Sequence, residues 1–559
     1  MGAGIATACG HHKDSAPPPP SSLTGSGGTR SSGGSGGKSG SGGTKHGAAG
    51  QSGEAGEGGA NGGSSAGTHH RGTGGTHGEA GGSEAGGGGV PYSGDMSGGT
   101  AGSAGAPGPG DGMGHLFVGP GGYDGGPGTR EQPFLTLAGA VSVAAAGDTI
   151  VFLDGNYAIP KGADAVTIPN GVSLAADNPR LAAFVGKGGT LLEFAGNSQL
   201  DGLRFDGFET AVAAAANDAS VSITRASFSN CPSDSGKSAL EIGGDTLVTV
   251  IDTDDATHDL GDCPALAHVY AHGKLTLDGE LLHFDGDAET AALSAEDSAT
   301  LELSNLNAED GNLPFLLLRG DSTTTLATST LKTSASHLIE LSGSPSLAVT
   351  ASELSLDASV TSPDACIVTT NGAGSTLALT AAVVMHGCKG ALVGPAPKTL
   401  TLANAEIYAM TESGLDLTTG SSSSVTITAS LFRNVPRAVR LGSGSPSTFA
   451  LKVRGTTLGD TVDSGFELDG DATSTWDFGT LADPGNNVLT ATTTALDVQS
   501  SAITSVTAVG NTWTPSVQAA DGSGQYAAPS SPGVLEVTSG SGQNYSDSAG
   551  ATLRLAESN

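Results

Sequence analysis

A pattern of paired apolar residues recurs along this chain of 559 residues and limits its fold more than any other feature. Two apolar residues are separated by one position, and a further apolar residue follows a few small or polar residues later. The pairs begin at Val221, Val248, Leu275, Leu301, Leu347, Leu377, Leu400, Val425 and Phe449, and the single residue Leu326 stands in the place of one pair, so that the intervals are 21 to 30 residues. The further residues are Phe228, Leu282, Leu306, Leu331, Leu354, Val384, Ile407 and Phe432. Such a period indicates stacked structural repeats.

The local spacing identifies the kind of repeat. Apolar residues two positions apart indicate strands, whereas helical repeats would show spacings of three and four. Turn residues such as Gly243-Gly244 and Asn371-Gly372 separate the strands. An antiparallel sandwich, the alternative, would reverse direction every 8–12 residues. We therefore predict an all-β fold, a single-stranded right-handed parallel β-helix with coils over residues 166–475.

Residues 115–165 differ from the repeats and predict a cap at the N-terminal end. An apolar strand at Leu116–Val118 is followed by a Gly/Pro-rich loop and later by a second strand at Thr149–Leu153. Between them, one helical stripe is formed by Leu137, Ala140, Val141 and Ala144. Thr136 is placed to cap this helix, and Gly147 is placed to end it.

The same block resembles a known module. It contains D-x-x-P-G-T at 124–129, Q-P-F at 132–134, G-D-T-I at 147–150 and D-G-x-Y at 154–157. This order resembles the N-terminal element of a family of unknown function, bacterial and lipoprotein-like, within the pectin-lyase-like right-handed parallel β-helix superfamily. The resemblance implies that the helix covers the open end of the β-helix. It carries over no catalytic residue.

The first 114 residues indicate an anchor and a tether. Residues 1–9 end in Ala6-Thr7-Ala8-Cys9, which resembles the lipobox of bacterial lipoproteins, so we expect Cys9 to carry a lipid. The basic and apolar stretches of a signal peptide do not precede it, so either translation starts upstream or the resemblance is accidental. Residues 10–114 are nearly all small or polar, which predicts a disordered Gly/Ser-rich linker rather than a folded Gly-rich domain.

The remaining cysteines predict two disulfides. Residues one coil apart lie about 4.8 Å apart, close to the Cα separation of a disulfide. Cys366 and Cys388 are one short coil apart, and Cys231 and Cys263 are separated by one coil plus a loop. We predict these two pairs. Zinc sites use closely spaced cysteines, a pattern that this chain does not contain, so we expect no metal site.

The repeat pattern breaks near residue 475. The segment 475–489 contains Pro and paired Asn, and both tryptophans, Trp476 and Trp513, follow the last repeat. We therefore predict a C-terminal cap and tail over residues 476–559, in which the tryptophans cover the last coil. A sugar-stacking platform is the alternative.

The charge of the folded region restricts its partners. Residues 115–559 hold 18 Lys and Arg against 49 Asp and Glu, and the whole chain has a net charge of −33. Such a surface repels phosphate groups, which argues against binding to nucleic acid or to anionic membranes. We expect a monomer that contacts a membrane only through its lipid anchor.

One cluster of ionisable residues is dense enough to suggest catalysis. Asp252, Asp254, Asp255 and His258, with Asp259, could serve glycoside hydrolysis or, with calcium, a lyase reaction. They are nearly consecutive, however, and have no partner acids in the next repeats, so a solvated turn explains them better. We expect no cofactor, with calcium as the weak exception.

Together these features predict a protein of the envelope of a Gram-negative-type bacterium, at the outer membrane or the extracellular surface. Its expected role is structural, adhesive or ligand-binding, without catalysis. Its expected partner is an extracellular polysaccharide or another envelope protein. The alternative is a carbohydrate-active enzyme, either a polysaccharide lyase or a glycoside hydrolase.

Overall fold

The structure is a computed structural model. It describes residues 114–514 with short gaps, of which the longest are 252–262, 283–290 and 357–364, together with the strands β45 (Val534–Ser539) and β46 (Ala551–Leu555). All of these residues belong to one compact unit, Thr100–Asn559. Among them, no helix is long and apolar enough to span a membrane.

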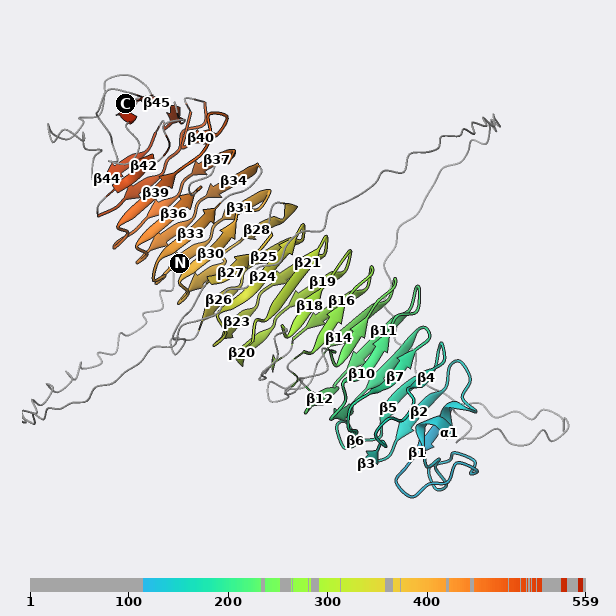
Figure 1. The fold of residues 1–559 in the computed structure, drawn as a ribbon. Coiled ribbons are helices and arrows are strands. Elements are labelled where there is room, and N and C mark those ends of the chain that lie inside the picture. The colour runs from blue at the N-terminus through green and yellow to red at the C-terminus, as the bar shows by residue number, and fades with distance from the viewer. Residues whose placement is uncertain are drawn as a thin grey trace, which may run out of the picture. The chain divides into compact units, whose positions relative to one another are not determined.

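A coil of three strands is the repeating unit. One coil, for example, runs through β8 (Ser198–Asp201), β9 (Leu203–Asp206) and β10 (Thr210–Ala214). Strand β8 pairs in parallel with β5 (Ser173–Ala176) of the coil before and with β11 (Ser220–Thr224) of the coil after. Figure 1 shows successive strands lying side by side along the stack. The described coils therefore form the predicted parallel β-helix.

Three parallel sheets result, here named sheets 1, 2 and 3. Sheet 1 begins at β1 (His115–Val118) and β2 (Thr149–Phe152) and continues through β5, β8 and β11 to β43 (Ser505–Thr507). Sheet 3 has fourteen strands, from β4 (Val166–Ile168) to β42 (Thr494–Val498). Sheet 2 has two parts, β3 (Gly155–Ala158) to β12 (Ser227–Ser229) and β17 (Leu281–Leu282) to β44 (Thr512–Thr514).

The repeated apolar pairs fill the interior of the coils. In sheet 1, Val221 of β11 is in register with Val248 of β14 (Leu247–Ile251), which is in register with Leu275 of β16 (Lys274–Asp278). All three side chains are fully buried. Each fully buried Val or Leu side chain contributes about 1.5–3 kcal/mol relative to exposure. The predicted pairs therefore belong to the core of the stack, with two corrections to their register. Leu326 stands opposite Leu303 and Thr324 opposite Leu301, and Val425 stands opposite Leu451 rather than Phe449.

Two of the predicted third residues were wrong. Leu354 of β26 (Glu353–Leu356) is in register with Met385 of β29 (Val384–His386), so Met385 and not Val384 continues the interior column of sheet 2. Similarly, Leu331 of β23 (Thr330–Thr333) is in register with Ala308 of β20 (Asn307–Gly311), whereas Leu306 precedes that strand. Small shifts of this kind follow from differences in turn length between coils.

The corner between sheets 1 and 2 takes only two residues in most coils. Its first residue adopts a left-handed backbone conformation, which asparagine tolerates and other L-residues rarely adopt. Examples are Asn305 (φ 54°), Thr328 (φ 51°), Ala351 (φ 47°), Asn404 (φ 54°) and Ala429 (φ 47°). Its second residue is buried and links neighbouring coils.

Buried serines make that link. The hydroxyl of Ser352 donates to the carbonyl of Thr350 (2.7 Å) and accepts from the backbone N–H of Ser329 in the preceding coil (3.1 Å). The hydroxyl of Ser329 does the same, donating to the carbonyl of Ala327 (2.8 Å) and accepting from the N–H of Leu306 (3.2 Å). These bonds satisfy backbone groups that the tight corner removes from the sheets.

The N-terminal cap is built around α1 (Leu137–Val141), at the end of the stack beside β1 and β4 (Figure 1). Thr136 caps the helix as predicted, because its Oγ1 accepts from the N–H of Gly139 (3.0 Å). The carboxylate of Asp124 holds this capping residue in place, because it accepts hydrogen bonds from the backbone N–H of Thr136 (2.8 Å) and from its hydroxyl (2.8 Å). The helix ends at Val141, earlier than expected; Gly147 (φ 98°) instead bonds to the carbonyl of Gly171 before β2.

The parallel coils extend past residue 475, where the sequence placed their end. Strand β40 (Thr475–Asp477) pairs in parallel with β37 (Phe449–Arg454), and β44 pairs in parallel with β41 (Val488–Thr490). Trp476 is only 3% exposed and packs 6.0 Å from the ring of Phe449, so it is a core residue and no sugar platform. Trp513 lies in β44.

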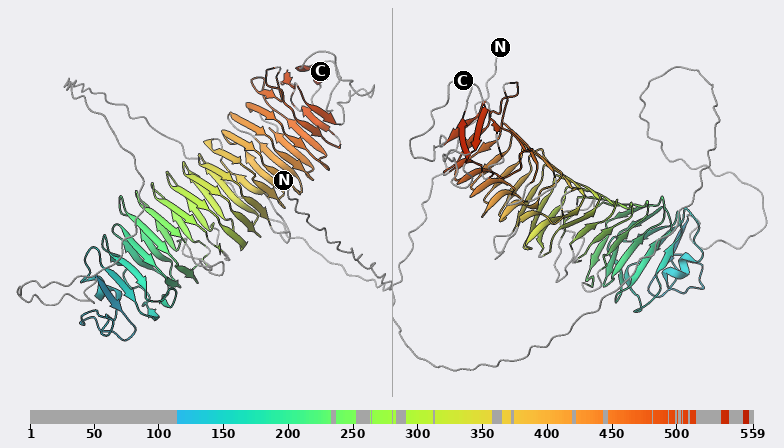
Figure 2. Two further views of the ribbon diagram at one scale, coloured as in Figure 1. Left: turned by 180° about the vertical axis from the view of Figure 1, so that it is seen from behind. Right: turned by 45° about the horizontal axis from the view of Figure 1, so that its top comes forward.

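Antiparallel strands lie at the C-terminal end of sheet 1. Strand β45 pairs with β43, and β46 pairs with β45, both antiparallel. Figure 2 shows these strands, in red, at the end of the stack. They are the only antiparallel pairings among the described strands, and they cover the edge that a further parallel coil would otherwise extend.

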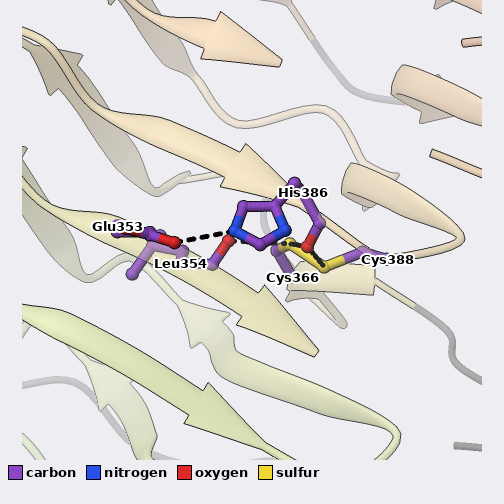
Figure 3. The surroundings of a disulfide bond; sticks show 5 residues. All are labelled: Glu353, Leu354, Cys366, His386 and Cys388. Atoms are coloured by element: carbon purple, nitrogen blue, oxygen red, sulfur yellow. Dashed lines mark hydrogen bonds and ion pairs between the residues drawn. A yellow bond between two sulfur atoms is a disulfide. The ribbon is translucent and has the colours of Figure 1, made fainter. Parts of the chain in front are cut away.

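Both predicted disulfides are confirmed. Cys231 and Cys263 are joined with a Cα–Cα distance of 5.0 Å, and Cys366 and Cys388 with 5.6 Å. Cys366 lies in β27 (Ala365–Thr369), and Figure 3 shows Cys388 beside it, two residues after His386. Both cysteines of this second pair are fully buried.

Removing the Cys366–Cys388 bond should destabilise the coils. We expect the double variant Cys366→Ala/Cys388→Ala to lose about 2–4 kcal/mol of unfolding free energy, because the bond restricts the unfolded chain. Urea denaturation without reductant measures this loss. Each single variant should lose a similar amount, since each breaks the same bond. An unchanged midpoint in the double variant would contradict the role of the bond.

The corner serines offer a second test. Ser352→Ala leaves the backbone N–H of Ser329 without its acceptor and should cost about 1–3 kcal/mol. Thr323→Ala, at an exposed position of β22 (Thr323–Ala327), is the matched control and should change stability by less than about 0.5 kcal/mol. Equal effects of the two substitutions in thermal unfolding would show that the corner bond contributes nothing.

Candidate functional site

Several residues singled out from the sequence lie outside the described residues. These are Cys9 and the acidic run with Asp252, Asp254, Asp255 and His258. The other four cysteines are joined in disulfides and so are not available as metal ligands. Within the described ranges, no three His, Cys, Asp or Glu side chains come together as a possible metal-binding group.

A different group of ionisable side chains does come together, on the outer side of sheet 3. We call Glu241, His268, Tyr270, Glu296 and Arg319 the His268 cluster. Glu241 lies in β13 (Leu240–Ile242), and His268 is in register with it in β15 (Ala267–Val269). Both face outward because the residues on either side of them in the strands are buried.

The next two coils complete the cluster. Glu296 directly follows β18 (Leu293–Ala295), and Arg319 lies in β21 (Leu316–Gly320). Tyr270 directly follows β15, and its ring lies over the position of Gly243 one coil below. A side chain at Gly243 would come within 2.4 Å of that ring. The glycine therefore provides the space that Tyr270 occupies.

The charges alternate across four successive coils. His268 Nδ1 lies 3.0 Å from Glu241 Oε2, and its Nε2 lies 3.9 Å from Glu296 Oε2. Arg319 Nη1 in turn donates to Glu296 Oε1 at 2.8 Å. The second oxygen of Glu241 accepts from the backbone N–H of Ser238 (2.9 Å). The imidazole is thus held between two carboxylates.

The surroundings favour the protonated imidazole. The hydrogen bond to Glu241 raises the pKa of His268, and the charges of Glu241 and Glu296 raise it further, against the opposing effects of burial and of Arg319. Burial, together with the charge of Glu241, raises the pKa of Tyr270, whose ring centroid lies 5.1 Å from that of His268. A protonated imidazole and a neutral phenol are both proton donors, which is the chemistry this group offers.

No short sequence motif indicates this cluster. Glu241, His268, Glu296 and Arg319 are 27, 28 and 23 residues apart, which is the period of the coils. The candidate ionisable residues predicted from the sequence are nearly consecutive ones and do not include this cluster. A search for acidic and basic residues one coil apart is the signal that could have found it.

Similar ion pairs join neighbouring coils elsewhere. Arg437 Nε lies 2.7 Å from Glu467 Oε1, and Arg440 Nε lies 2.9 Å from Asp416 Oδ1. Further pairs are Arg225–Asp201, Lys274–Glu302, Arg433–Glu406 and Arg454–Asp477. In each pair the cation is neutralised by a carboxylate of an adjacent coil, so it is not a free counter-charge for an anionic polymer.

A second outward column lies on sheet 2. The rings of His386 and Tyr408 stack 4.9 Å apart, and the guanidinium of Arg433 lies 4.2 Å from the centre of the Tyr408 ring. Figure 3 shows the imidazole of His386 turned toward Glu353, at 2.8 Å. Both faces of the Tyr408 ring are therefore covered, which prevents it from stacking on a sugar ring.

No family model matches the chain, and no curated protein matches it. Among solved structures, it is similar to the catalytic unit of a GH87 α-1,3-glucanase from Streptomyces thermodiastaticus, with 12% identity and a TM-score of 0.32 over 64% of this chain and 66% of that one.

Two further solved structures are similar at the same level. One is a mannuronic-acid-specific polysaccharide family 6 lyase from human gut microbiota, with 12% identity and a TM-score of 0.31 over 63% of this chain and 77% of that one. The other is the A-module of the mannuronan C-5 epimerase AlgE6 of Azotobacter vinelandii, with 11% identity and a TM-score of 0.29 over 68% and 94%. The similarity concerns the β-helix fold, and no residue role is transferred from it.

The His268 cluster predicts a stability that depends on pH. Because the folded-state pKa is raised, the cluster's contribution is complete below the pKa of the unfolded chain and is lost as pH rises through the folded pKa. His268→Gln should therefore lose on the order of 1–2 kcal/mol at pH 5 and less at pH 9. Urea denaturation at both pH values measures the difference. The exposed His272 supplies the control, His272→Gln; a His268→Gln loss that is the same at both pH values would contradict the prediction.

Proposed function

We propose that this protein is a β-helix of the bacterial cell envelope that binds an extracellular polysaccharide without cleaving it. The observation that carries the proposal is the neutralisation of outward cations by carboxylates of adjacent coils. The imidazole of His268, the guanidinium groups of Arg319, Arg437 and Arg440 and the ammonium group of Lys274 are engaged in this way. They hold the coils together instead of standing free as acids, bases or uronate-binding cations.

The shape of the unit supports a polymeric partner. Each outward column repeats one side chain per coil, at the strand spacing of about 4.8 Å. A long periodic face of this kind suits an extended chain better than a compact ligand. The net charge of −33 disfavours nucleic acid as that chain. Another envelope protein is the second kind of partner that such faces suit, with the protein itself as a monomer.

An oxidising compartment is supported by the two disulfides, because such bonds persist outside the cytosol. We propose that Cys9 carries a lipid that holds the protein at the outer membrane, with residues 10–114 as the tether. The lipid would be the sole membrane contact of the protein.

A test of the anchor follows from Cys9. The chain expressed from its own locus should fractionate with membranes and incorporate labelled fatty acid. Cys9→Ala should shift it to the soluble envelope fraction, whereas the disulfide variant Cys366→Ala/Cys388→Ala should still be labelled. A wild-type protein that takes up no label would overturn the anchor.

A carbohydrate-active enzyme is the second candidate, and one observation favours it. In the His268 cluster, the imidazole of His268, whose pKa is raised, lies between two carboxylates and beside the phenol of Tyr270, on an accessible face. General acid–base catalysis uses groups of these types. Arg319 would have to release Glu296 before it could pair with the carboxylate of a uronate substrate.

Incubation with polysaccharides separates the two candidates. The full chain is mixed with pectate, alginate and neutral glucans, and the ultraviolet absorbance of unsaturated uronates, new reducing ends and bound polysaccharide are measured. We expect binding without new chain ends. Product formation would reject the non-catalytic role, and its loss in His268→Ala or Tyr270→Phe, but not in His272→Ala, would assign catalysis to the cluster.

A further inference from the structure

A groove of about 480 Å³ lies on the outer side of sheet 1, close to the N-terminal cap. Ser173, Gln199, Ser220 and Ser222 line it from the strands β5, β8 and β11, and Gly171 and Asn197 line it from the corner that leads into these strands. Gln199 is in register with Ser222, so Ser173, Gln199 and Ser222 form one outward column across three coils. Volumes of this size are typical of ligand sites.

We propose that this groove is a binding site for a neutral, hydroxyl-rich glycan. The inference rests on the proposed polysaccharide binding and names the site and the class of sugar. All of the residues that line the groove are uncharged, in a chain whose net charge is −33. Carboxamide and hydroxyl groups both donate and accept hydrogen bonds, as sugar hydroxyls require.

The corner holds the polar groups in place. Asn170 Oδ1 accepts from the backbone N–H of Asn197 (2.8 Å), and Asn197 Oδ1 accepts from the backbone N–H of Ser220 (2.8 Å). The oxygen of the Asn197 carboxamide is thus used within the fold, which leaves its NH₂ group as a fixed donor for a ligand. Groups held in this way lose little freedom on binding.

Gly171 keeps the floor of the groove close to the cap. Its φ of 82° is a conformation that suits glycine, and a side chain there would lie 3.0 Å from the Cβ of Ala146. Its carbonyl accepts from the N–H of Gly147, and its own N–H donates to the carbonyl of Asn197. The cap and three coils therefore fix the shape of the groove together.

The charges nearby disfavour a polyuronate. No cation lines the groove, so the carboxylate of a uronate would find no counter-charge there. Beyond the far end of β11, the guanidinium of Arg225 is already bonded to the carboxylate of Asp201 (Nε–Oδ1 2.7 Å). The excess of acidic residues over the chain repels an anionic polymer further. A neutral glycan needs no counter-charge and is not repelled by the acidic residues.

The test measures binding of defined hexasaccharides to the full chain by titration calorimetry. The probes are β-1,4-glucan and β-1,3-glucan hexasaccharides, with oligomannuronate and oligogalacturonate as charged counterparts. Gln199→Ala removes a carboxamide, and Ser222→Glu places a charge in the groove. The matched controls are Thr325→Ala and Thr426→Glu, which lie in the same outward column of sheet 1 several coils away.

We expect wild type and both controls to bind a neutral hexasaccharide with the same affinity within about twofold. Gln199→Ala should weaken binding by about fivefold, as the loss of one hydrogen bond predicts, and Ser222→Glu should weaken it by more. Unchanged thermal unfolding of all four variants would show that they fold.

Each other outcome overturns a different statement. Equal affinities in the groove variants and the controls would overturn the groove as the site. Preferential binding of the oligouronates would overturn the neutral class of ligand. Both results would leave the proposed polysaccharide binding in place, whereas no binding to any probe or to the parent polysaccharides would overturn both.

Discussion

In-register pairing between successive coils is the constraint on which the rest of the structure depends. When Val221, Val248 and Leu275 stand opposite one another in sheet 1, the register of all the remaining residues of those strands is fixed as well. Side chains of the same position then form columns, alternately inside and outside the coil. The interior columns exclude water over the length of the described stack, while the exterior columns determine what the surface can bind.

The exterior columns place the few cations of this acidic protein beside carboxylates of neighbouring coils. Arginine and lysine side chains meet carboxylates one coil away, and each pair links two coils across the sheet. Exposed pairs of this type contribute little individually, about 0–1 kcal/mol. The groove at Gln199 differs from these columns, because all of the residues that line it are uncharged.

Backbone groups that the parallel sheets leave unpaired find partners at the corners of the coils or are covered at the two ends of the stack. Buried serines such as Ser329 and Ser352 take up the N–H groups of the tight corner. At one end, α1 and its capping residue Thr136 lie beside the first strands; at the other, β45 and β46 turn the pairing antiparallel. An open parallel edge would recruit further chains, so both ends serve solubility as well as stability.

The sequence by itself determined the fold, the N-terminal cap and the two disulfides. The fold and the disulfides follow from spacings of two residues within a strand and of one coil between repeats, and the cap follows from the helical spacing of Leu137, Ala140, Val141 and Ala144 after Thr136. The tertiary structure decided what depends on the register itself. Because the coils differ in length, from 23 residues between Leu301 and Thr324 to 30 between Leu347 and Leu377, the sequence period could not show that Met385 rather than Val384 follows Leu354. It also could not show that His268 meets Glu241 and Glu296. Which side chains meet between coils depends on the length of every turn between them, and only the folded structure shows those lengths.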